Sequence, residues 1–204
     1  MYKIIAIDGP ASVGKSTLAK KFAKKFRSPI LFSGKLYRAV ALELIRRKSD
    51  PNNIQNILRS VDRIDLNKLD TEGLYSSDVD ILSSIISTKK RLRNKLITLQ
   101  RNFPKEHGKS SKFAIIEGRD IGTVIFPDAD YKIFLWADAK IRAKRRYKQI
   151  LKNRKKASFR RILNEINARD RKDLTRKIAP LMPAANSVLL DTCLLYTSPS
   201  PRDS

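Results

Sequence analysis

Short apolar runs and helical patterns alternate along this chain. The apolar runs at 2–8, 30–32, 113–116, 132–136 and 187–190 are short enough to be buried strands. Between most of them, apolar residues recur at spacings of three and four, which is typical of helices packed on a core. Strands that alternate with helices are typical of a parallel sheet covered on both faces. We therefore expect a three-layer α/β domain with a mostly parallel, five-stranded sheet.

Some of the helical patterns predict a helix more clearly than others. Clear helices are predicted at 36–47 and 139–151 and after Ser158, a residue that favours a helix N-terminus. The apolar stripe from Asp78 to Phe103 predicts one long helix, either as part of an insert over the mouth of the sheet or as a plain core helix. The segment 49–75 is the least informative, because turn residues flank one short helical pattern.

The first strand runs directly into a glycine-rich loop. Residues 9–16 read Gly-Pro-Ala-Ser-Val-Gly-Lys-Ser and match the phosphate-loop pattern G-x-x-x-x-G-K-[ST] at every fixed position. A strand precedes the loop and a helix follows it, which disfavours a chance glycine turn. In such a loop, backbone N–H groups hold phosphates, Lys15 reaches the β- and γ-phosphates, and the Ser16 hydroxyl holds Mg²⁺. The loop and the start of the following helix comprise Gly9, Pro10, Ala11, Ser12, Val13, Gly14, Lys15, Ser16 and Thr17.

Polar residues also follow the second and third predicted strands. Ser33 and Arg38 follow the second strand, where an ordinary helix start explains them as well as a ligand site does. Glu117 and Asp120 flank a glycine and an arginine after the third strand. The carboxyl ends of parallel strands form the ligand crevice of such sheets, so we favour a site over a structural ion pair. Glu117 is expected to act on the metal or its waters.

The region after the fourth strand is strongly basic. The predicted helix 139–151 carries many lysines and arginines, and residues 152–157 are predicted to form a short lid. Arginines and acids then alternate over 169–176, a pattern that fits either a solvated face or a phosphate clamp. We favour the clamp, because arginine binds phosphate oxygens with two parallel bonds and a lid excludes water.

Composition narrows the class of protein. The 204 residues carry a formal net charge of +24. This charge is compatible with binding to nucleic acid, with binding of polyanionic nucleotides, or with compositional drift that carries no function. The basic residues are spread along the chain, so we expect no specific nucleic-acid partner. There is one cysteine, and no stretch has the length of a membrane span. We expect a cytoplasmic, monomeric enzyme of small-molecule nucleotides that has no membrane partner.

Taken together, these segments resemble the bacterial type of the cytidylate kinase family. The resemblance runs from Lys3 to Thr192 and rests on the phosphate loop, on Ser33-Gly34-Lys35-Leu36-Tyr37-Arg38, and on Glu117-Gly118-Arg119-Asp120-Ile121-Gly122-Thr123 with 126–129. Further matches are Arg169-Asp170-Arg171-Lys172-Asp173 with Arg176, and 179–181. The family transfers the γ-phosphoryl group of ATP to CMP or dCMP with Mg²⁺, in pyrimidine metabolism. The resemblance implies a P-loop kinase fold, a helical nucleoside-monophosphate-binding insert at 49–105 and the lid at 152–157.

The resemblance also implies residue roles, the first being that Gly9 to Thr17 bind the ATP phosphates. Ser84, Arg93 and Asp120 would bind the cytosine, and Tyr37, Arg169 and Asp173 would lie near the ribose with Ser33 close by. The arginines expected to gather the CMP phosphate and the transferring group are Arg38, Arg119, Arg169 and Arg176, the last three acting with Lys15 in catalysis. The chain departs from the family at Lys35, where a small residue is usual, and at 74–76, where an arginine is common. The stretch from Ser60 to Ser84 is also shorter than in many members of the family, which insert a small antiparallel sheet there.

The last twelve residues have a different character. The domain is expected to span 1–192, and 193–204 resemble the in-frame translation of a transposase adapter used in sequencing libraries. A natural disordered tail is the alternative, since Thr-Ser-Pro-Ser-Pro suits one. We favour a non-native tail on a C-terminally truncated chain, with no redox or metal role for Cys193. For the domain itself, the alternatives are another phosphate-loop kinase or a basic RNA-binding protein gated by nucleotide.

Overall fold

A five-stranded parallel sheet forms the centre of the protein. The computed structural model describes residues 2–108, 111–152 and 156–193. Every neighbouring pair of strands in the sheet is parallel, and the strand order is β2-β3-β1-β4-β5. The strands are β1 (Lys3–Asp8), β2 (Ile30–Phe32), β3 (Phe113–Glu117), β4 (Tyr131–Trp136) and β5 (Val188–Asp191). The predicted parallel sheet is therefore confirmed, with each strand within two residues of its expected ends.

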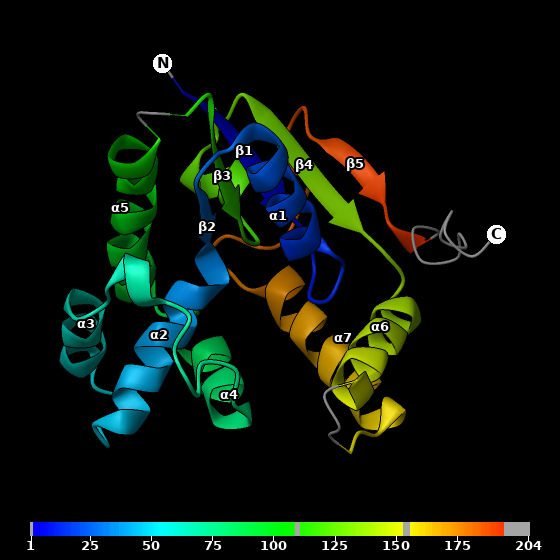
Figure 1. The fold of residues 1–204 in the computed structure, drawn as a ribbon. Helices are drawn as coiled ribbons and strands as arrows, with labels where there is room; N and C mark the ends of the chain where they lie inside the picture. The colour runs from blue at the N-terminus through cyan, green and yellow to red at the C-terminus, as the bar shows by residue number, and fades with distance from the viewer. Residues whose placement is uncertain (1, 109–110, 153–155, 194–204) are drawn as a thin grey trace.

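Helices cover both faces of the sheet (Figure 1). Successive residues of β1 alternate between two cores: Ile5 and Ile7 pack under α1, whereas Ala6 packs with α2 and α5. This alternation follows from the two-residue period of a strand. The helices are α1 (Lys15–Phe26), α2 (Ser33–Arg46), α3 (Ile54–Asp62), α4 (Ser77–Ile86), α5 (Lys90–His107), α6 (Ala139–Lys152) and α7 (Phe159–Thr175), with short turns η1 (Leu66–Lys68) and η2 (Ile121–Ile125).

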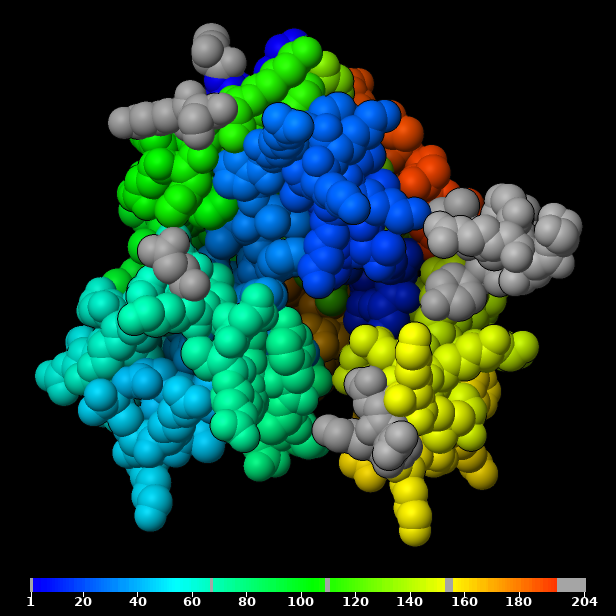
Figure 2. Space-filling view, in the orientation of Figure 1, coloured from blue at the N-terminus to red at the C-terminus, as the bar shows by residue number. Residues whose placement is uncertain are grey.

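Two groups of helices project beyond the carboxyl ends of the strands. Figure 1 shows α2, α3 and α4 on one side and α6 and α7 on the other. The α6–α7 pair has a small core of its own around Ala143, Ile162 and Ile166. In the space-filling view the surface is hollowed between α4 and α6, below α1 (Figure 2). The predicted lid falls partly on residues 153–155, which lie outside the described residues.

The prediction of one helix over 78–103 is wrong, because the chain forms α4 and α5 with a break between them. Ser87 and Thr88 turn their hydroxyls back onto the carbonyls of Ser84 and Ile85. Such local bonds compete with continued helical pairing. Lys89 then adopts an extended conformation as the N-cap of α5, which begins at Lys90. The apolar stripe alone did not reveal this interruption.

Two other helix ends differ from the prediction. α2 begins at Ser33, three residues before the expected start, so Arg38 lies on its second turn and not on its first. α5 continues through Pro104 to His107, although the predicted helix ended at Phe103.

In the described ranges, no helix has both the length and the apolar character needed to cross a bilayer.

Candidate active site

The phosphate loop connects the end of β1 to the start of α1. β1 has β3 on one side and β4 on the other, so the loop lies where the strand order reverses. Gly9 has φ 143°, and a Cβ there would lie 2.3 Å from the Leu135 carbonyl oxygen of β4. Gly14 has φ 103° and precedes the first residue of α1. Both glycines are therefore required by the loop's backbone, and the loop presents the N-terminus of α1 to the crevice.

Lys15 folds back over this loop. Its Nζ donates to the Pro10 carbonyl at 2.7 Å and lies 3.6 Å from Glu117 Oε1. Burial, followed by the nearby Arg119 guanidinium, lowers the pKa of Lys15 to about 7. A buried ammonium beside an arginine lacks sufficient negative charge around it. The negative charge of a bound polyanion would therefore stabilise the charged form of Lys15.

This lowered pKa predicts proton uptake on binding ATP. At pH 8 the Lys15 amine of the free protein is largely neutral, because its pKa of about 7 lies below that pH. ATP phosphates beside the amine favour the charged form, so binding should take up close to one proton per site, and less as the pH falls below 7. Titration calorimetry at pH 8 in two buffers of different ionisation enthalpy measures this uptake. Equal apparent enthalpies in both buffers would contradict the prediction, and Lys15→Ala should abolish the uptake.

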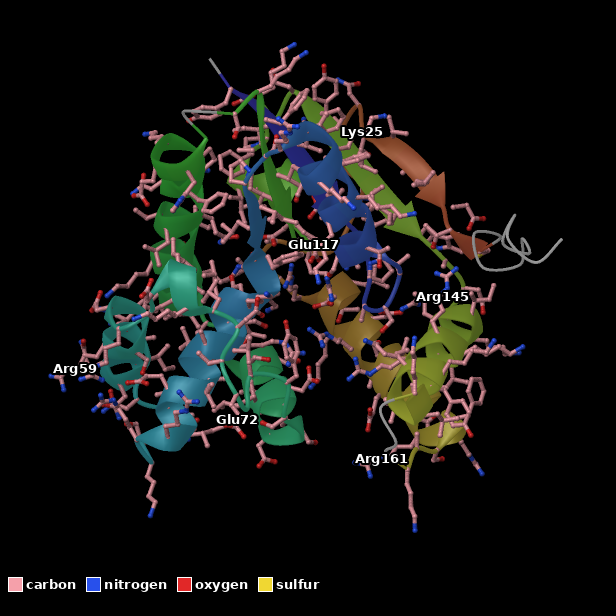
Figure 3. The ribbon with its side chains drawn as sticks, in the orientation of Figure 1. Lys25, Arg59, Glu72, Glu117, Arg145 and Arg161 are labelled. Atoms are coloured by element: carbon pink, nitrogen blue, oxygen red, sulfur yellow. The ribbon has the colours of Figure 1, made fainter. Side chains whose placement is uncertain are left out.

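Ser16 and Glu117 form the pair that was predicted to hold a metal. Ser16 Oγ donates to Glu117 Oε2 at 2.9 Å, and Glu117 is only 8% exposed. Figure 3 places Glu117 at the end of β3, beside the start of α1. One hydroxyl and one carboxylate beside a phosphate site suit Mg²⁺, which prefers oxygen ligands and keeps several waters. The residues present therefore fit a magnesium ion that is completed by phosphate and water.

Asp8, for which the sequence predicted no role, holds the segment after β3 in place. Its two carboxylate oxygens accept from the backbone N–H groups of Ile121 (2.9 Å) and Gly122 (2.7 Å). Burial raises the pKa of Asp8 to about 6 although these bonds oppose the rise. The two bonds fix the start of η2, and therefore the position of Asp120 immediately before it. Its place at the end of an apolar strand was the signal that could have revealed it.

The predicted cytosine residues are partly brought together. An Arg93 Nη2 donates to Asp120 Oδ2, and both side chains are buried. The Arg93 guanidinium lies 6.0 Å from the centre of the Tyr37 ring, and burial raises the pKa of Tyr37 to about 12. The break between α4 and α5 contributes to this arrangement, because Arg93 Nη1 also donates to the Ser87 carbonyl at 3.2 Å. A charged pair with a neutral phenol beside it can recognise a polar ring edge.

Ser84 and Ser33 are less closely tied to this pair. Ser84 is half-buried in α4, and within the described residues it has no hydrogen bond to Arg93 or Asp120. Ser33 is buried, and its hydroxyl donates to Gln100 Oε1 of α5 at 2.5 Å. A Cβ on Gly118 would lie 3.3 Å from Ser33 Cβ, so Ser33 borders the crevice at the end of β3. The contacts of both serines with a nucleotide remain predictions.

A second cluster joins the end of β3 to α7. Arg119 Nε donates to Asp173 Oδ2 at 3.1 Å. Arg176 lies 3.8 Å from carboxylate oxygens of both Asp173 and Asp120, and its Nε donates to the Ala179 carbonyl. Burial lowers the pKa of Arg176, with Arg93 adding to the effect. Arg119 after β3, Arg93 of α5 and Arg176 at the end of α7 thus converge on one polar region beside the phosphate loop.

Arg38 and Arg169 meet at a residue that was not predicted. Both donate to Asp80 Oδ1 of α4, Arg169 at 3.2 Å, and Arg38 also donates to the Leu74 carbonyl at 3.2 Å. Burial, with Arg119 next in effect, lowers the pKa of Arg169. Asp80 therefore links an arginine of the α2 side to one of the α7 side.

Arg142, which was predicted only as part of a basic run, anchors α6 and α7 to the phosphate loop. It is 4% exposed and forms two bonds to the Asp170 carboxylate, at 3.2 and 2.5 Å. It also donates to the carbonyls of Ala11 (3.1 Å) and Ala137 (2.8 Å). Asp170 is thus bound to this anchor and is not part of the arginine cluster.

A cavity of about 740 Å³ extends from the phosphate loop towards β5. It is lined by the loop and α1, by Arg145 and Arg146 of α6, and by Leu190 and Thr192. Thr192 Oγ1 donates to the Val13 carbonyl (3.0 Å) and accepts from Arg145 (3.1 Å). Figure 3 shows Arg145 on this side of the molecule, where α6 approaches the end of β5. The volume suits a nucleotide whose phosphates lie on the loop.

Fold and site together define the class of phosphate-loop kinases, and comparison with known proteins identifies the family. The family model for cytidylate kinase matches residues 5–198. A cytidylate kinase of Bartonella tribocorum is 40% identical over 189 residues, 93% of this chain and 86% of the relative. One from Acidiphilium cryptum is 41% identical over 192 residues, 93% of this chain and 87% of the relative. The chain belongs to the cytidylate kinase family.

Solved structures agree with the fold. A crystal structure of an uncharacterized protein from Eubacterium ventriosum has a TM-score of 0.50 at 16% identity, covering 94% of this chain and 90% of that one. Similarity at this level bears on the fold alone.

Proposed function

We propose that the protein transfers the γ-phosphoryl group of ATP to CMP or dCMP, giving ADP and the cytidine diphosphate. The observation that carries this proposal is the position of the Arg93–Asp120 pair, which is buried beside the arginine cluster and on the same crevice as the phosphate loop. Membership of the cytidylate kinase family supports the same reaction.

In this proposal, the loop from Gly9 to Thr17 holds the ATP phosphates. Lys15 moves from the Pro10 carbonyl to the β- and γ-phosphates and neutralises charge as the bond to the leaving group breaks. The CMP phosphate and the transferring group are gathered by four arginines: Arg38, Arg119, Arg169 and Arg176. Positioning and charge neutralisation provide most of the rate acceleration in phosphoryl transfer.

Ser16 and Glu117 would hold Mg²⁺ together with ATP oxygens and water. When bound, the ion supplies charge neutralisation on the β- and γ-phosphates. The residues of the chain then orient the acceptor: Arg93 and Asp120 bind the cytosine with Ser84 nearby, and Tyr37, Asp173 and Ser33 border the ribose. The helical insert at 49–105 and the lid at 152–157 are expected to close over the two nucleotides and exclude water.

A coupled assay of ADP release tests the proposed function directly. Purified protein is incubated with ATP, Mg²⁺ and one acceptor at a time: CMP, dCMP, UMP or AMP. We expect release with CMP or dCMP to exceed release with UMP and AMP by tens-fold, because a misplaced polar group in a buried site costs about 1–3 kcal/mol. Higher kcat/KM with UMP or AMP would favour a different nucleoside-monophosphate kinase.

Partners and location also remain proposals. We propose a monomeric cytoplasmic enzyme whose ligands are nucleotides and which has no specific nucleic-acid or membrane partner. The basic side chains that line the crevice, among them Arg93, Arg119 and Arg176, are engaged with carboxylates in pairs suited to handling phosphates. This use of charge requires no nucleic acid.

We propose further that residues 193–204 are a non-native segment of adapter origin. Residues 194–204 lie outside the described residues. The apolar side chains of Trp136, Val188 and Leu189, near the junction, are 51%, 64% and 65% exposed, as expected where a native C-terminal element would cover them. Cys193 Sγ accepts from the Asp138 N–H at 3.4 Å, and we propose no redox or metal role for it. Sequencing the source DNA past the Thr192 codon should show a different continuation; a genomic reading of Cys193 to Ser204 followed by a stop codon would refute the proposal.

A further inference from the structure

Asp80 accepts hydrogen bonds from arginines of three different helices. Arg38 of α2 and Arg169 of α7 donate to Oδ1, and Arg146 of α6 donates to Oδ2 at 3.5 Å. Asp80 itself belongs to α4, on the other side of the hollow from α6 (Figure 2). Its contacts therefore connect the two groups of helices that project beyond the sheet.

These arginines include the ones expected to bind substrate. Arg38 and Arg169 are two of the residues proposed above to gather the CMP phosphate. A carboxylate and a phosphate present similar acceptor oxygens to a guanidinium, and both are bound by two parallel bonds where geometry allows. One arginine donor cannot point fully at both acceptors. The Asp80 carboxylate therefore takes donors that a substrate phosphate needs.

We propose that Asp80 is an internal competitor for the substrate phosphate, and that it sets the affinity for CMP. The proposal rests on the proposed function, because that function assigns Arg38 and Arg169 to the phosphate. When CMP enters, its phosphate displaces the carboxylate from these two arginines. The side chain of Asp80 is 23% exposed and can turn to water without being buried unpaired.

The competition has a second consequence. While Asp80 is bound, it holds α4 against Arg146 of α6 and Arg169 of α7 and adds its negative charge beside them. When the phosphate replaces it, the same arginines remain neutralised and α4 is released from them. Binding of CMP is therefore coupled to movement of the insert relative to α6 and α7.

The test neutralises Asp80 with little change of shape. In Asp80→Asn, the affinity for CMP should rise at least fivefold, since hydrogen bonds to charged groups are among the stronger ones and the substrate no longer has to break them. Inorganic phosphate should also bind more tightly, whereas cytidine, which has no phosphate, should bind equally well to both proteins. Titration calorimetry without ATP measures all three. KM for CMP should fall accordingly, with no rise in kcat.

Asp78→Asn is the matched control, because Asp78 is an exposed aspartate in the first turn of the same helix. It removes the same charge, and CMP affinity should stay within about twofold of wild type, since exposed charges interact weakly. Asp80→Glu keeps a carboxylate beside the arginines and should also leave CMP affinity near that of wild type. An equal gain in Asp78→Asn would attribute the effect to net charge and overturn the proposal.

Unchanged or weaker CMP binding in Asp80→Asn would also overturn the proposal, because it would mean that Asp80 orients the arginines and does not compete for them. If Asp80→Asn folds only with an anion, phosphate should restore folding at constant ionic strength and chloride should not; failure of phosphate would refute the competition. Failure of the proposed function is distinct: wild type would release no ADP with ATP and CMP, while the phosphate titration would still decide the role of Asp80.

Discussion

Replacing Lys15 by alanine is expected to reduce kcat with CMP by about a thousandfold or more while leaving the protein folded. Removing one donor aimed at developing charge in a water-excluded site costs about 10²–10³ in rate, and Lys15 carries a full charge once the ATP phosphates lie beside it. Burial lowers the pKa of Lys15, so its ammonium is costly in the folded, nucleotide-free protein. The variant should therefore be at least as stable as wild type in urea unfolding.

Lys24→Ala is the control for this result. Lys24 is an exposed lysine in the last turn of the same helix, α1, so its loss changes the net charge equally but leaves the loop intact. Its kcat should remain near the wild-type value. A folded Lys15→Ala protein with close to wild-type turnover would remove the phosphate loop from the reaction.

Replacing Asp120 by asparagine is expected to reduce the preference for CMP over UMP by tens-fold. Cytosine presents an amino donor where uracil presents a carbonyl acceptor. The Asp120 carboxylate can accept from the amine but would face a lone pair of uracil, and such a mismatch costs roughly 1–3 kcal/mol in a buried site. The asparagine amide can donate as well as accept, so it can satisfy either base. The ratio of kcat/KM for CMP and UMP measures the effect.

A loss of stability in Asp120→Asn does not change the ratio of kcat/KM for CMP and UMP. Asp120 also pairs with Arg93, so the variant should unfold more easily, but both substrates are measured on the same protein. Asp128→Asn, at an exposed position after η2, should leave the ratio unchanged. An unchanged ratio in Asp120→Asn itself would exclude Asp120 from base recognition.

The phosphate loop and the sheet could be predicted because their signals are local. A short apolar run, two glycines at fixed spacing and a following helix specify the strand, the turn and the helix N-terminus without reference to distant residues. The chain order of strands and helices then implied a parallel sheet. The observed parallel pairing of neighbouring strands agrees with this prediction.

The arginine cluster could be predicted only in part, because its partners are distant in sequence. Arg119 with Asp173 and Arg93 with Asp120 join residues 54 and 27 positions apart. Local patterns identified these residues as candidates but did not pair them. The pair at Arg93 depends further on the break after α4, which releases the Ser87 carbonyl to accept from Arg93. Periodicity had predicted an unbroken helix there.

Asp80 illustrates what periodicity cannot reveal. In the sequence it is one of two acids near the start of a helical pattern, where acids commonly favour the helix dipole. Its partners come from residues 38, 146 and 169, on three other helices. Only the arrangement of those helices beyond the sheet distinguishes Asp80 from the exposed Asp78.

The most direct test of the account is the rate of ADP release with CMP in wild type, Lys15→Ala and Asp120→Asn, each measured against UMP. The account predicts rapid release with CMP in wild type, a strong preference over UMP, loss of turnover in Lys15→Ala and loss of the preference in Asp120→Asn. A wild-type protein that is folded and binds ATP, yet releases ADP no faster with CMP than without an acceptor, would contradict it.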